Sequence, residues 1–333
     1  MYDLHSHTPL SDGDTPSEEV VQAAISRGAR VLAITDHDII NREVGKLIRE
    51  YHATFDQITQ HKSPWIDVVE GVEVSICHVD NEYQKSMHML AYSHRLPDSL
   101  DIFLQKIRMG KLEKIQLQCE TLSSHGFQIQ LDGGNLIPFS LENLKHRFPK
   151  SNIENLNNGH ISEAFLEVDT NLDSVSKLTG KNIDSKNFLS QCLKKEGEFT
   201  RKISLPRDVP PYEPSFESLV KQLDKNKTVI SLPHAHVTFK TVGEFQDRVG
   251  KLVDIGMNAI EISATMPVEW VQVVDQTRTK YDLLLTFGSD SHGIGKTDRY
   301  HGEFMTLNPV LQGSESVVGE WMEVFLKKTG AAV

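Results

Sequence analysis

Cysteine is scarce in this chain, with only three among 333 residues, at Cys77, Cys119 and Cys192. An odd number at wide spacing gives neither a disulfide framework nor a Cys-x-x-Cys metal clip, so we expect ordinary buried thiols. No apolar run approaches the roughly 18 residues that a membrane span needs. No basic and then apolar leader follows Met1. We therefore expect a cytoplasmic protein without membrane association.

Positive charge is in deficit, because 35 Lys and Arg residues stand against 46 Asp and Glu residues, for a formal net charge of −11. This balance argues against a protein that binds duplex DNA by neutralising phosphates. Any anionic substrate must therefore meet local positive charge. The composition, with 38% hydrophobic and 24% charged residues, is typical of a globular chain. The length allows one large domain, alone or with an insertion.

Short apolar runs alternate with helical patterns over most of the chain. The first helical pattern, residues 17–27, precedes the run at residues 31–35, and polar or ionisable residues accompany most runs. The other runs lie at residues 65–69, 87–92, 228–232, 259–262 and 283–287. Such runs indicate parallel strands in an α/β fold. Ligands bind at the carboxyl ends of these strands in α/β barrels and open sheets, so we expect the site there.

The segment from residue 95 to 212 differs, because it has helical patterns and loops without comparable strands. Its first expected helix, residues 98–124, carries one apolar stripe into which Lys111 falls. We expect residues 1–94 and 213–333 to form one discontinuous domain. Residues 95–212 are then an inserted helical subdomain that caps the active site. A further helix is expected over residues 314–328.

Histidines and carboxylates collect at the ends or edges of the expected strands. His5 and His7 are two apart, so in a strand their side chains point to the same side. Imidazole and carboxylate are the ligand types of zinc, manganese and iron, and a site for several such ions needs at least six donors. Nine candidate ligands are present: His5, His7, Asp12, His37, Glu73, His88, His234, Asp290 and His292.

In aggregate these motifs resemble those of the PHP (polymerase and histidinol phosphatase) superfamily. The matching motifs are His5-x-His7 with Ser11-Asp12-Gly13, residues 33–38 (AITDHD), residues 71–75 (GVEVS), residues 88–91 (HMLA) and residues 288–293 (GSDSHG). The resemblance implies a distorted seven-stranded (β/α)7 barrel. The helical insertion at residues 95–212 resembles that of one branch of the superfamily. Members of this branch act on nucleoside monophosphates, 3',5'-bisphosphates and the 5' end of short RNA.

The resemblance also implies a centre of three divalent metal ions, Mn, Fe or Zn. The first metal would be held by His5, His7, Glu73 and Asp290, the second by Asp12, His37 and His292, and the third by Glu73, His88 and His234. Catalysis would proceed through a metal-bridging hydroxide supported by Asp12, His37, Glu73 and His292.

Several neighbours of these ligands leave alternatives open. His236 is an alternative to His234 as a ligand of the third metal. We favour His234 because it is closer to the end of the expected strand, from which only Pro233 separates it. Asp36 and Asp38 flank His37 and either orient it or serve a structural role. Glu70 is expected at the surface or in contact with the ligand residues, without being a ligand itself.

Four residues are candidates for substrate binding: Lys111, His160, Arg299 and His301. The related branch tends to have arginine where Lys111 stands, and lysine offers a point charge where arginine clamps a phosphate through two bonds. His160 matches the branch, but its arginine neighbour is missing. Arg299 and His301 lie in a polar loop after the last metal motif.

The expected function is metal-dependent hydrolysis of phosphomonoesters of nucleotides, AMP or a 3',5'-nucleoside bisphosphate, or of the 5' end of short single-stranded RNA. A histidinol-phosphate type of small-molecule phosphatase is one alternative. A catalytically inactive metal-binding module is another, and the presence of all nine candidate ligands argues against it.

Overall fold

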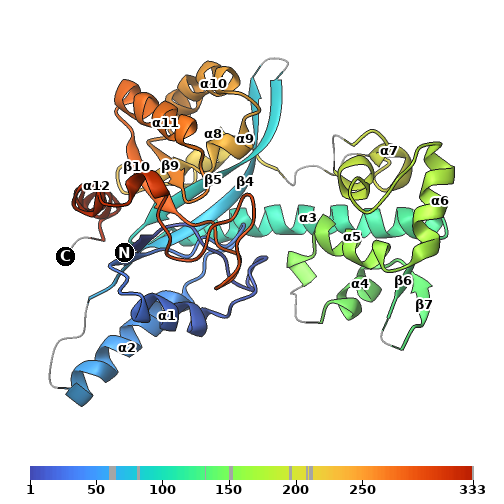
Figure 1. Cartoon of the computed structure of the whole chain (residues 1–333), viewed down its shortest axis with the longest axis horizontal. Helices are drawn as coiled ribbons and strands as arrows, with labels where there is room; N and C mark the ends of the chain where they lie inside the picture. Colours follow the sequence, from blue (N-terminus) through green and yellow to red (C-terminus); the bar gives the residue numbers. More distant parts are fainter. Residues whose placement is uncertain are drawn as a thin grey trace. The chain divides into compact units, whose positions relative to one another are not determined.

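The computed structural model describes residues 1–59, 65–80, 83–131, 133–149, 153–194, 197–207, 209 and 213–331 (Figure 1). The chain divides into two compact units. The larger unit consists of Met1–Gln105 and Glu213–Val333, and the smaller unit is Lys106–Tyr212. Helix α3 (Asp98–Ser124) begins in the larger unit and continues into the smaller one, so the division falls later than residue 95. Residue 212, where we expect the insertion to end, lies outside the described residues.

The described strands of the larger unit form a sheet of three strands and a sheet of five. The smaller sheet has the order β1-β2-β3 and the larger one β10-β9-β8-β5-β4. In chain order the strands are β1 (Tyr2–Asp3), β2 (Val31–Leu32), β3 (Asp67–Val68), β4 (Glu70–Asp80), β5 (Tyr83–Ser93), β8 (Val229–Leu232), β9 (Ala259–Ser263) and β10 (Leu284–Gly288).

The mixed α/β class is confirmed, but the strand directions are only partly as expected. Strands β1, β2 and β3 are parallel, as are β8, β9 and β10. The run at residues 87–92 lies instead in β5, which pairs antiparallel with β4 along the whole of both strands and antiparallel with β8. The reason is that β4 and β5 are consecutive strands that pair directly, without the long crossover that a parallel pair requires.

A closed barrel of seven strands is not formed by the regular ladders of the described residues. The three-stranded sheet is short, since each of its strands has only two residues. Beyond these ladders the chain makes isolated parallel bridges, Ser6 with Ser291 and His37 with Glu73. The candidate ligands that follow β1 and β2, His5, His7 and His37, therefore lie beyond the regular ladders.

Helices cover the two sheets of the larger unit. Strands β8 and β9 are buried along their whole length, as expected of apolar strands covered on both faces. Helices α1 and α2 pack together, α11 packs on β9 and α12 packs on β10 (Figure 1). The helices, besides the first part of α3, are α1 (Ser17–Ser26), α2 (Glu43–Thr59), α8 (Phe216–Val220), α9 (Ala235–Thr238), α10 (Val242–Ile255), α11 (Val268–Tyr281), a 3₁₀ turn (Pro309–Leu311) and α12 (Glu315–Thr329).

The smaller unit has a hydrophobic core of its own, in which the Phe165 and Phe188 rings stack with centroids 3.9 Å apart. Helices dominate it, as expected, but it also contains an antiparallel pair of short strands that the sequence reading omits. Its elements, besides the rest of α3, are β6 (Gln128–Gln130), β7 (Leu136–Pro138), α4 (Leu141–Arg147), a 3₁₀ turn (Ile153–Asn155), α5 (Asn158–Leu166), α6 (Asp169–Thr179), a π-helical turn (Leu189–Leu193) and α7 (Thr200–Ile203).

Among the described residues, no helix combines the length and the apolar character needed to cross a membrane. The long helix α3 carries charged residues throughout, including Asp101, Lys106 and Glu120.

Candidate metal centre

The Glu73 carboxylate, in β4, is the centre of the candidate site and is 1% exposed. Its Oε2 atom lies 3.1 Å from Nε2 of His5 and 3.3 Å from Nε2 of His7. The same oxygen lies 3.3 Å from Nδ1 of His37. One carboxylate oxygen thus faces three imidazoles that come from two separate parts of the sequence.

The second oxygen of Glu73 faces two further imidazoles. Oε1 lies 2.9 Å from Nδ1 of His88, in β5, and 3.0 Å from Nε2 of His234, which follows β8. The Nδ1 atom of the competing residue His236 is buried without a hydrogen-bond partner among the described residues. The structure therefore favours His234 over His236 as a member of this group.

Asp290 and Asp12 supply two more carboxylates, which face the two ring nitrogens of His7. Asp290 Oδ1 lies 3.2 Å from His7 Nε2 and 3.4 Å from His5 Nε2. Asp12 Oδ1 lies 3.4 Å from Nε2 of His292. Asp12 also lies 3.8 Å from His7 Nδ1 and 3.7 Å from His37 Nε2. All nine expected ligands are therefore in one connected cluster, which we call the nine-residue cluster.

Backbone pairing explains how residues so far apart in sequence meet. The Asp290 N–H donates to the His5 carbonyl at 2.7 Å, and the His7 N–H donates to the Ser291 carbonyl at 2.9 Å. The segment that carries the first two histidines is thereby aligned with the segment after β10. The Asp38 N–H donates to the Glu73 carbonyl at 2.8 Å, which aligns the segment after β2 with β4.

Left-handed backbone conformations also occur at this end of the strands. Asp38 has φ 54°, His234 φ 31° and Asp290 φ 55°. Such values are uncommon in residues other than glycine and cost free energy, so they persist only where the surrounding structure holds them. Their concentration around the cluster is typical of a functional site.

Electrostatics in the cluster follow from the packing of carboxylates against imidazoles. Burial by itself would lower the pKa of His7, but the nearby Asp290 and Glu73 carboxylates outweigh it and raise the pKa to about 10. Burial raises the pKa of Glu73, but the surrounding His37, His88 and His5 outweigh that effect and hold this pKa well below its usual range. The Glu73 carboxylate therefore retains its charge near neutral pH.

The donor set fits divalent cations. Candidate groups whose ligand atoms lie within 4.8 Å of one another are His5, His7, Glu73 and Asp290; His7, Asp12, His37 and His292; His37, Glu73 and His88; and Asp290, His292 and His301. Buried ring nitrogens, Nε2 of His7 and Nδ1 of His37, lack hydrogen-bond partners. Buried polar atoms are normally satisfied, and a metal ion would satisfy these.

Asp36 and Asp38 hold the surrounding loops. Asp36 accepts hydrogen bonds from the Thr8 N–H and hydroxyl and from the Ser11 hydroxyl, each at 2.7 Å. It thereby ties the loop that carries Asp12 to the segment that carries His37. Asp38 accepts from the Ser75 N–H at 2.8 Å and hydroxyl at 3.0 Å.

The sequence analysis did not assign a fourth carboxylate, Glu261, to the cluster. Glu261, in β9, is fully buried and accepts a hydrogen bond at 2.8 Å from His5 Nδ1. Its other oxygen accepts from the His234 N–H at 2.9 Å. The available signal was a glutamate inside an otherwise apolar strand, since a buried charge needs partners.

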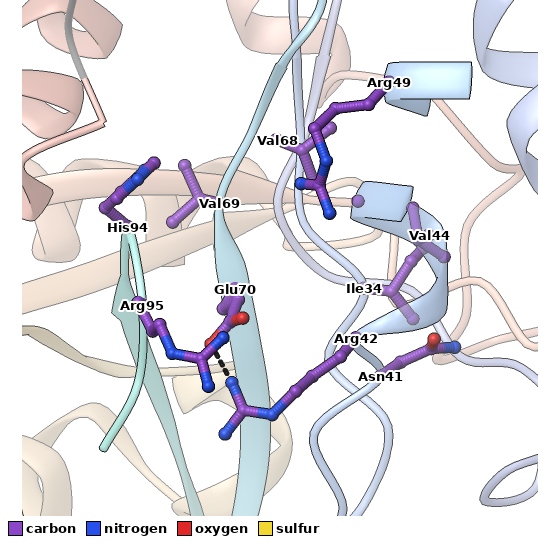
Figure 2. A pocket seen from close by; sticks show the side chains of 11 residues that line it. Ile34, Asn41, Arg42, Val44, Arg49, Val68, Val69, Glu70, His94 and Arg95 are labelled. Atoms are coloured by element: carbon purple, nitrogen blue, oxygen red, sulfur yellow. Dashed lines mark hydrogen bonds and ion pairs between the residues drawn. The ribbon is translucent and has the colours of Figure 1, made fainter. Parts of the chain in front are cut away.

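Glu70 lies apart from the cluster although it is only three residues from Glu73 in β4. It lines a separate cavity of about 200 Å³, where it is paired with Arg42 (Figure 2). It also accepts a hydrogen bond from the Leu96 N–H at 2.8 Å. Residues three apart in a strand point to opposite faces, which separates the two glutamates.

Two of the expected substrate-binding residues, Arg299 and His301, lie in the larger unit. His301 contacts the nine-residue cluster there, at His292. Its ring centroid lies 4.2 Å from that of His292, and its Nδ1 atom lies 2.8 Å from Asp298 Oδ2. Arg299 is exposed, with its guanidinium over the Tyr300 ring.

The other two expected substrate residues belong to the smaller unit. Lys111 is half-buried on α3. His160 forms a capping box with Asn157 at the start of α5, in which His160 Nδ1 accepts from the Asn157 N–H at 3.2 Å. A local structural role is therefore clear for His160, and phosphate binding by either residue stays a prediction.

Residues 3–133 match the family model of the PHP domain. No curated protein matches the sequence. The chain is similar to a solved structure from Bifidobacterium adolescentis, provisionally described as a metal-dependent phosphoesterase, with 19% identity, a TM-score of 0.59 and 95% of each chain covered.

A second similar structure is that of an amidohydrolase from Chromobacterium violaceum with bound sulfate and no metal. It is 18% identical, with a TM-score of 0.63, and the alignment covers 95% of this chain and 96% of that one. At such identities the two structures show a shared fold. The match to the PHP domain, over residues 3–133, contains six members of the nine-residue cluster.

Proposed function

We propose that this protein is a hydrolase of phosphate esters that depends on divalent metal ions held by the nine-residue cluster. The observation that carries the proposal is the Glu73 carboxylate, whose two oxygens face five imidazoles within 3.3 Å. The PHP domain match supports it. The similar structure described provisionally as a metal-dependent phosphoesterase supports it as well.

Three metal positions are proposed, with Glu73 shared between two of them. His5, His7, Glu73 and Asp290 would hold the first, Asp12, His37 and His292 the second, and Glu73, His88 and His234 the third. The first set coincides with a group whose ligand atoms all lie within 4.8 Å of one another. When bound, such ions would supply Lewis-acid polarisation of the phosphate ester and activation of water near neutral pH.

The chain's own residues at the mouth of the cluster would then position the substrate. The His301 ring is held by Asp298 and packs against His292. From this position it would donate a hydrogen bond to a phosphate oxygen or to the leaving oxygen. Arg299, two residues earlier, would supply positive charge in a chain whose overall charge is negative.

The proposed substrates are phosphomonoesters of nucleotides, AMP or a 3',5'-nucleoside bisphosphate, or the 5' end of a short RNA. Support comes from the resemblance in the inserted segment, where Lys111 and His160 stand. Lysine at residue 111 offers a phosphate one charge without the paired bonds of arginine. We therefore propose that Lys111 contributes to affinity for the phosphate.

A turnover panel tests this function. Purified protein is stripped with EDTA, reloaded with Mn²⁺, and assayed with AMP, 3'-phosphoadenosine 5'-phosphate, a 5'-phosphorylated trinucleotide and histidinol phosphate. The proposal expects metal-dependent phosphate release and the highest kcat/KM for a nucleotide substrate. Highest turnover of histidinol phosphate would assign the smaller substrate instead. Turnover that survives complete metal removal would contradict the metal-dependent reaction.

The matched variants for this assay are two histidine substitutions. His7→Asn removes an imidazole from the cluster, whereas His94→Asn removes an exposed one that lies outside it. Loss of activity in the first variant alone supports the cluster as the reaction centre. Equal activity of the two variants would contradict it.

A further inference from the structure

We propose that Glu261 is a positioning residue that orients two members of the cluster at once, His5 and His234, without itself being a ligand. The inference rests on the proposed function, because both histidines are proposed metal ligands. It adds a role for a residue that lies in neither of their segments. A single buried carboxylate would thereby couple the first and third metal positions.

The contacts of Glu261 are matched to its two oxygens. Oε1 accepts from Nδ1 of His5 at 2.8 Å, and Oε2 accepts from the backbone N–H of His234 at 2.9 Å. Both oxygens act as acceptors, so the ionised carboxylate satisfies the two donors together. Glu261 is fully buried, which prevents water from replacing it.

The bond to His5 determines how the imidazole presents its other nitrogen. In the neutral imidazole, a proton on Nδ1 that is donated to Glu261 leaves Nε2 with a lone pair. That Nε2 atom lies 3.1 Å from Glu73 and 3.4 Å from Asp290, on the cluster side of the ring. The Glu261 contact therefore favours the form of His5 that can bind a cation.

The bond to His234 supports a backbone conformation that is unfavourable by itself. His234 has φ 31°, in the left-handed region where residues other than glycine are strained. Its ring nevertheless must point to Glu73, since Nε2 lies 3.0 Å from Oε1 of that residue. Anchoring the N–H to Glu261 compensates for part of this strain and holds the ring in place.

The neighbouring strand makes room for this arrangement. A Cβ atom at Gly288 in β10 would lie 2.2 Å from the His5 Cβ and 2.8 Å from the Glu261 Oε1 atom. Glycine at this position therefore permits the close approach of His5 to Glu261. The contact between His5 and Glu261 thus depends on three separate segments of the chain, which carry His5, Glu261 and Gly288.

The variant Glu261→Gln can keep only one of the two hydrogen bonds that Glu261 accepts, from His5 and from His234. An amide of nearly the same shape has one acceptor oxygen and one donor nitrogen, so it cannot accept from both donors. If its nitrogen faces His5, the imidazole must carry its proton on Nε2, where a metal would bind. If its nitrogen faces the His234 N–H, two donors meet and His234 must move.

Thr286→Val is the matched control. Thr286 is the register partner of Glu261 across β9 and β10 and is fully buried. Its hydroxyl is hydrogen-bonded to that of Ser231 at 2.8 Å. The substitution removes a buried polar contact next to Glu261 without touching His5 or His234.

The test measures the dissociation constant of Zn²⁺ by calorimetry for the wild type and both variants, with urea unfolding of the metal-free proteins as the stability readout. We expect Glu261→Gln to weaken Zn²⁺ binding by about 10- to 100-fold, as for other residues that orient metal ligands. Thr286→Val should stay within about twofold of the wild type, even if both variants lose stability. Nitrogen-15 NMR of the zinc-loaded wild type should show a protonated His5 Nδ1, and Glu261→Gln should lose this proton when the amide nitrogen faces His5.

The possible failures are distinguishable. Unchanged Zn²⁺ affinity in Glu261→Gln would overturn the inference while leaving the proposed function intact. An equal loss in Thr286→Val would reduce the effect to general packing and overturn it too. A wild type that binds no Zn²⁺ would instead contradict the proposed function, and this inference with it.

Discussion

Glu73 and Glu70 lie on the same strand, three residues apart, yet they have different surroundings. Glu73 is buried among the imidazoles of the cluster, whereas Glu70 pairs with Arg42 in a separate cavity. The same residue type on one strand therefore provides an internal comparison between a cluster position and a structural position.

Substituting each glutamate by glutamine should give different results. Glu73→Gln removes the charge that is shared by five imidazoles, so we expect kcat to fall by more than about 100-fold, beyond the effect of residues that only orient ligands. Glu70→Gln weakens a half-buried ion pair, and we expect kcat/KM within about twofold of the wild type. Steady-state assays with Mn²⁺ check both values. Similar losses in the two variants would contradict the assignment of Glu73 to the centre.

Metal removal should destabilise the folded protein. Metal ions that bind to the cluster in the native state stabilise it by mass action. The stabilisation is about 2.7 kcal/mol at a metal concentration 100 times the dissociation constant. We therefore expect EDTA to lower the Tm and Mn²⁺ or Zn²⁺ to restore it. In Glu73→Gln the metal-induced rise in Tm should be small. A wild-type Tm that is indifferent to EDTA would argue against bound metal.

Lys111→Ala should reduce turnover of a nucleotide without changing metal binding. A charge-assisted contact with phosphate contributes about 1.5–3 kcal/mol, so we expect kcat/KM for AMP to fall at least tenfold. Lys145→Ala, which removes a half-buried lysine of the same unit that donates to the Pro149 carbonyl, is the control. If Lys111→Ala stays within twofold of the wild type, Lys111 is an ordinary residue of the inserted segment.

The thiols of Cys119 and Cys192 should be unreactive in the native protein. Burial raises the pKa of each to about 12, with the Glu120 charge adding to the effect at Cys119. The nucleophilic thiolate is populated only as the pH rises toward that pKa, so little is present at pH 8. We expect mass spectrometry to find iodoacetamide adducts at these residues only after unfolding. Rapid labelling of native Cys119 at pH 8 would disagree with its burial.

Much of the cluster could be predicted because its members follow or lie within recognisable apolar runs. Asp290 and His292 come directly after the run that forms β10, and His37 comes soon after the run that contains β2. Parallel strands bring such ends together whatever their separation in sequence. The pattern of apolar runs thus indicates where histidines and carboxylates meet, and the resemblance to the PHP motifs indicates which of them do.

Other features depend on contacts that a linear pattern does not contain. The direction of β5 follows from its pairing with β4, which its apolar and polar alternation does not specify. Glu261 occupies a strand interior, and its role depends on the His5 ring and the His234 backbone. The cap made by His160 likewise depends on its distance from Asn157.

The central claim is that divalent ions bind between Glu73 and the histidines around it. Crystals grown with Mn²⁺ and measured at the manganese absorption edge test it most directly. The account predicts anomalous density beside the Glu73 carboxylate, within bonding distance of His5 and His7 on one side and of His88 and His234 on the other. Anomalous density confined to other parts of the molecule, with none beside Glu73, would contradict it.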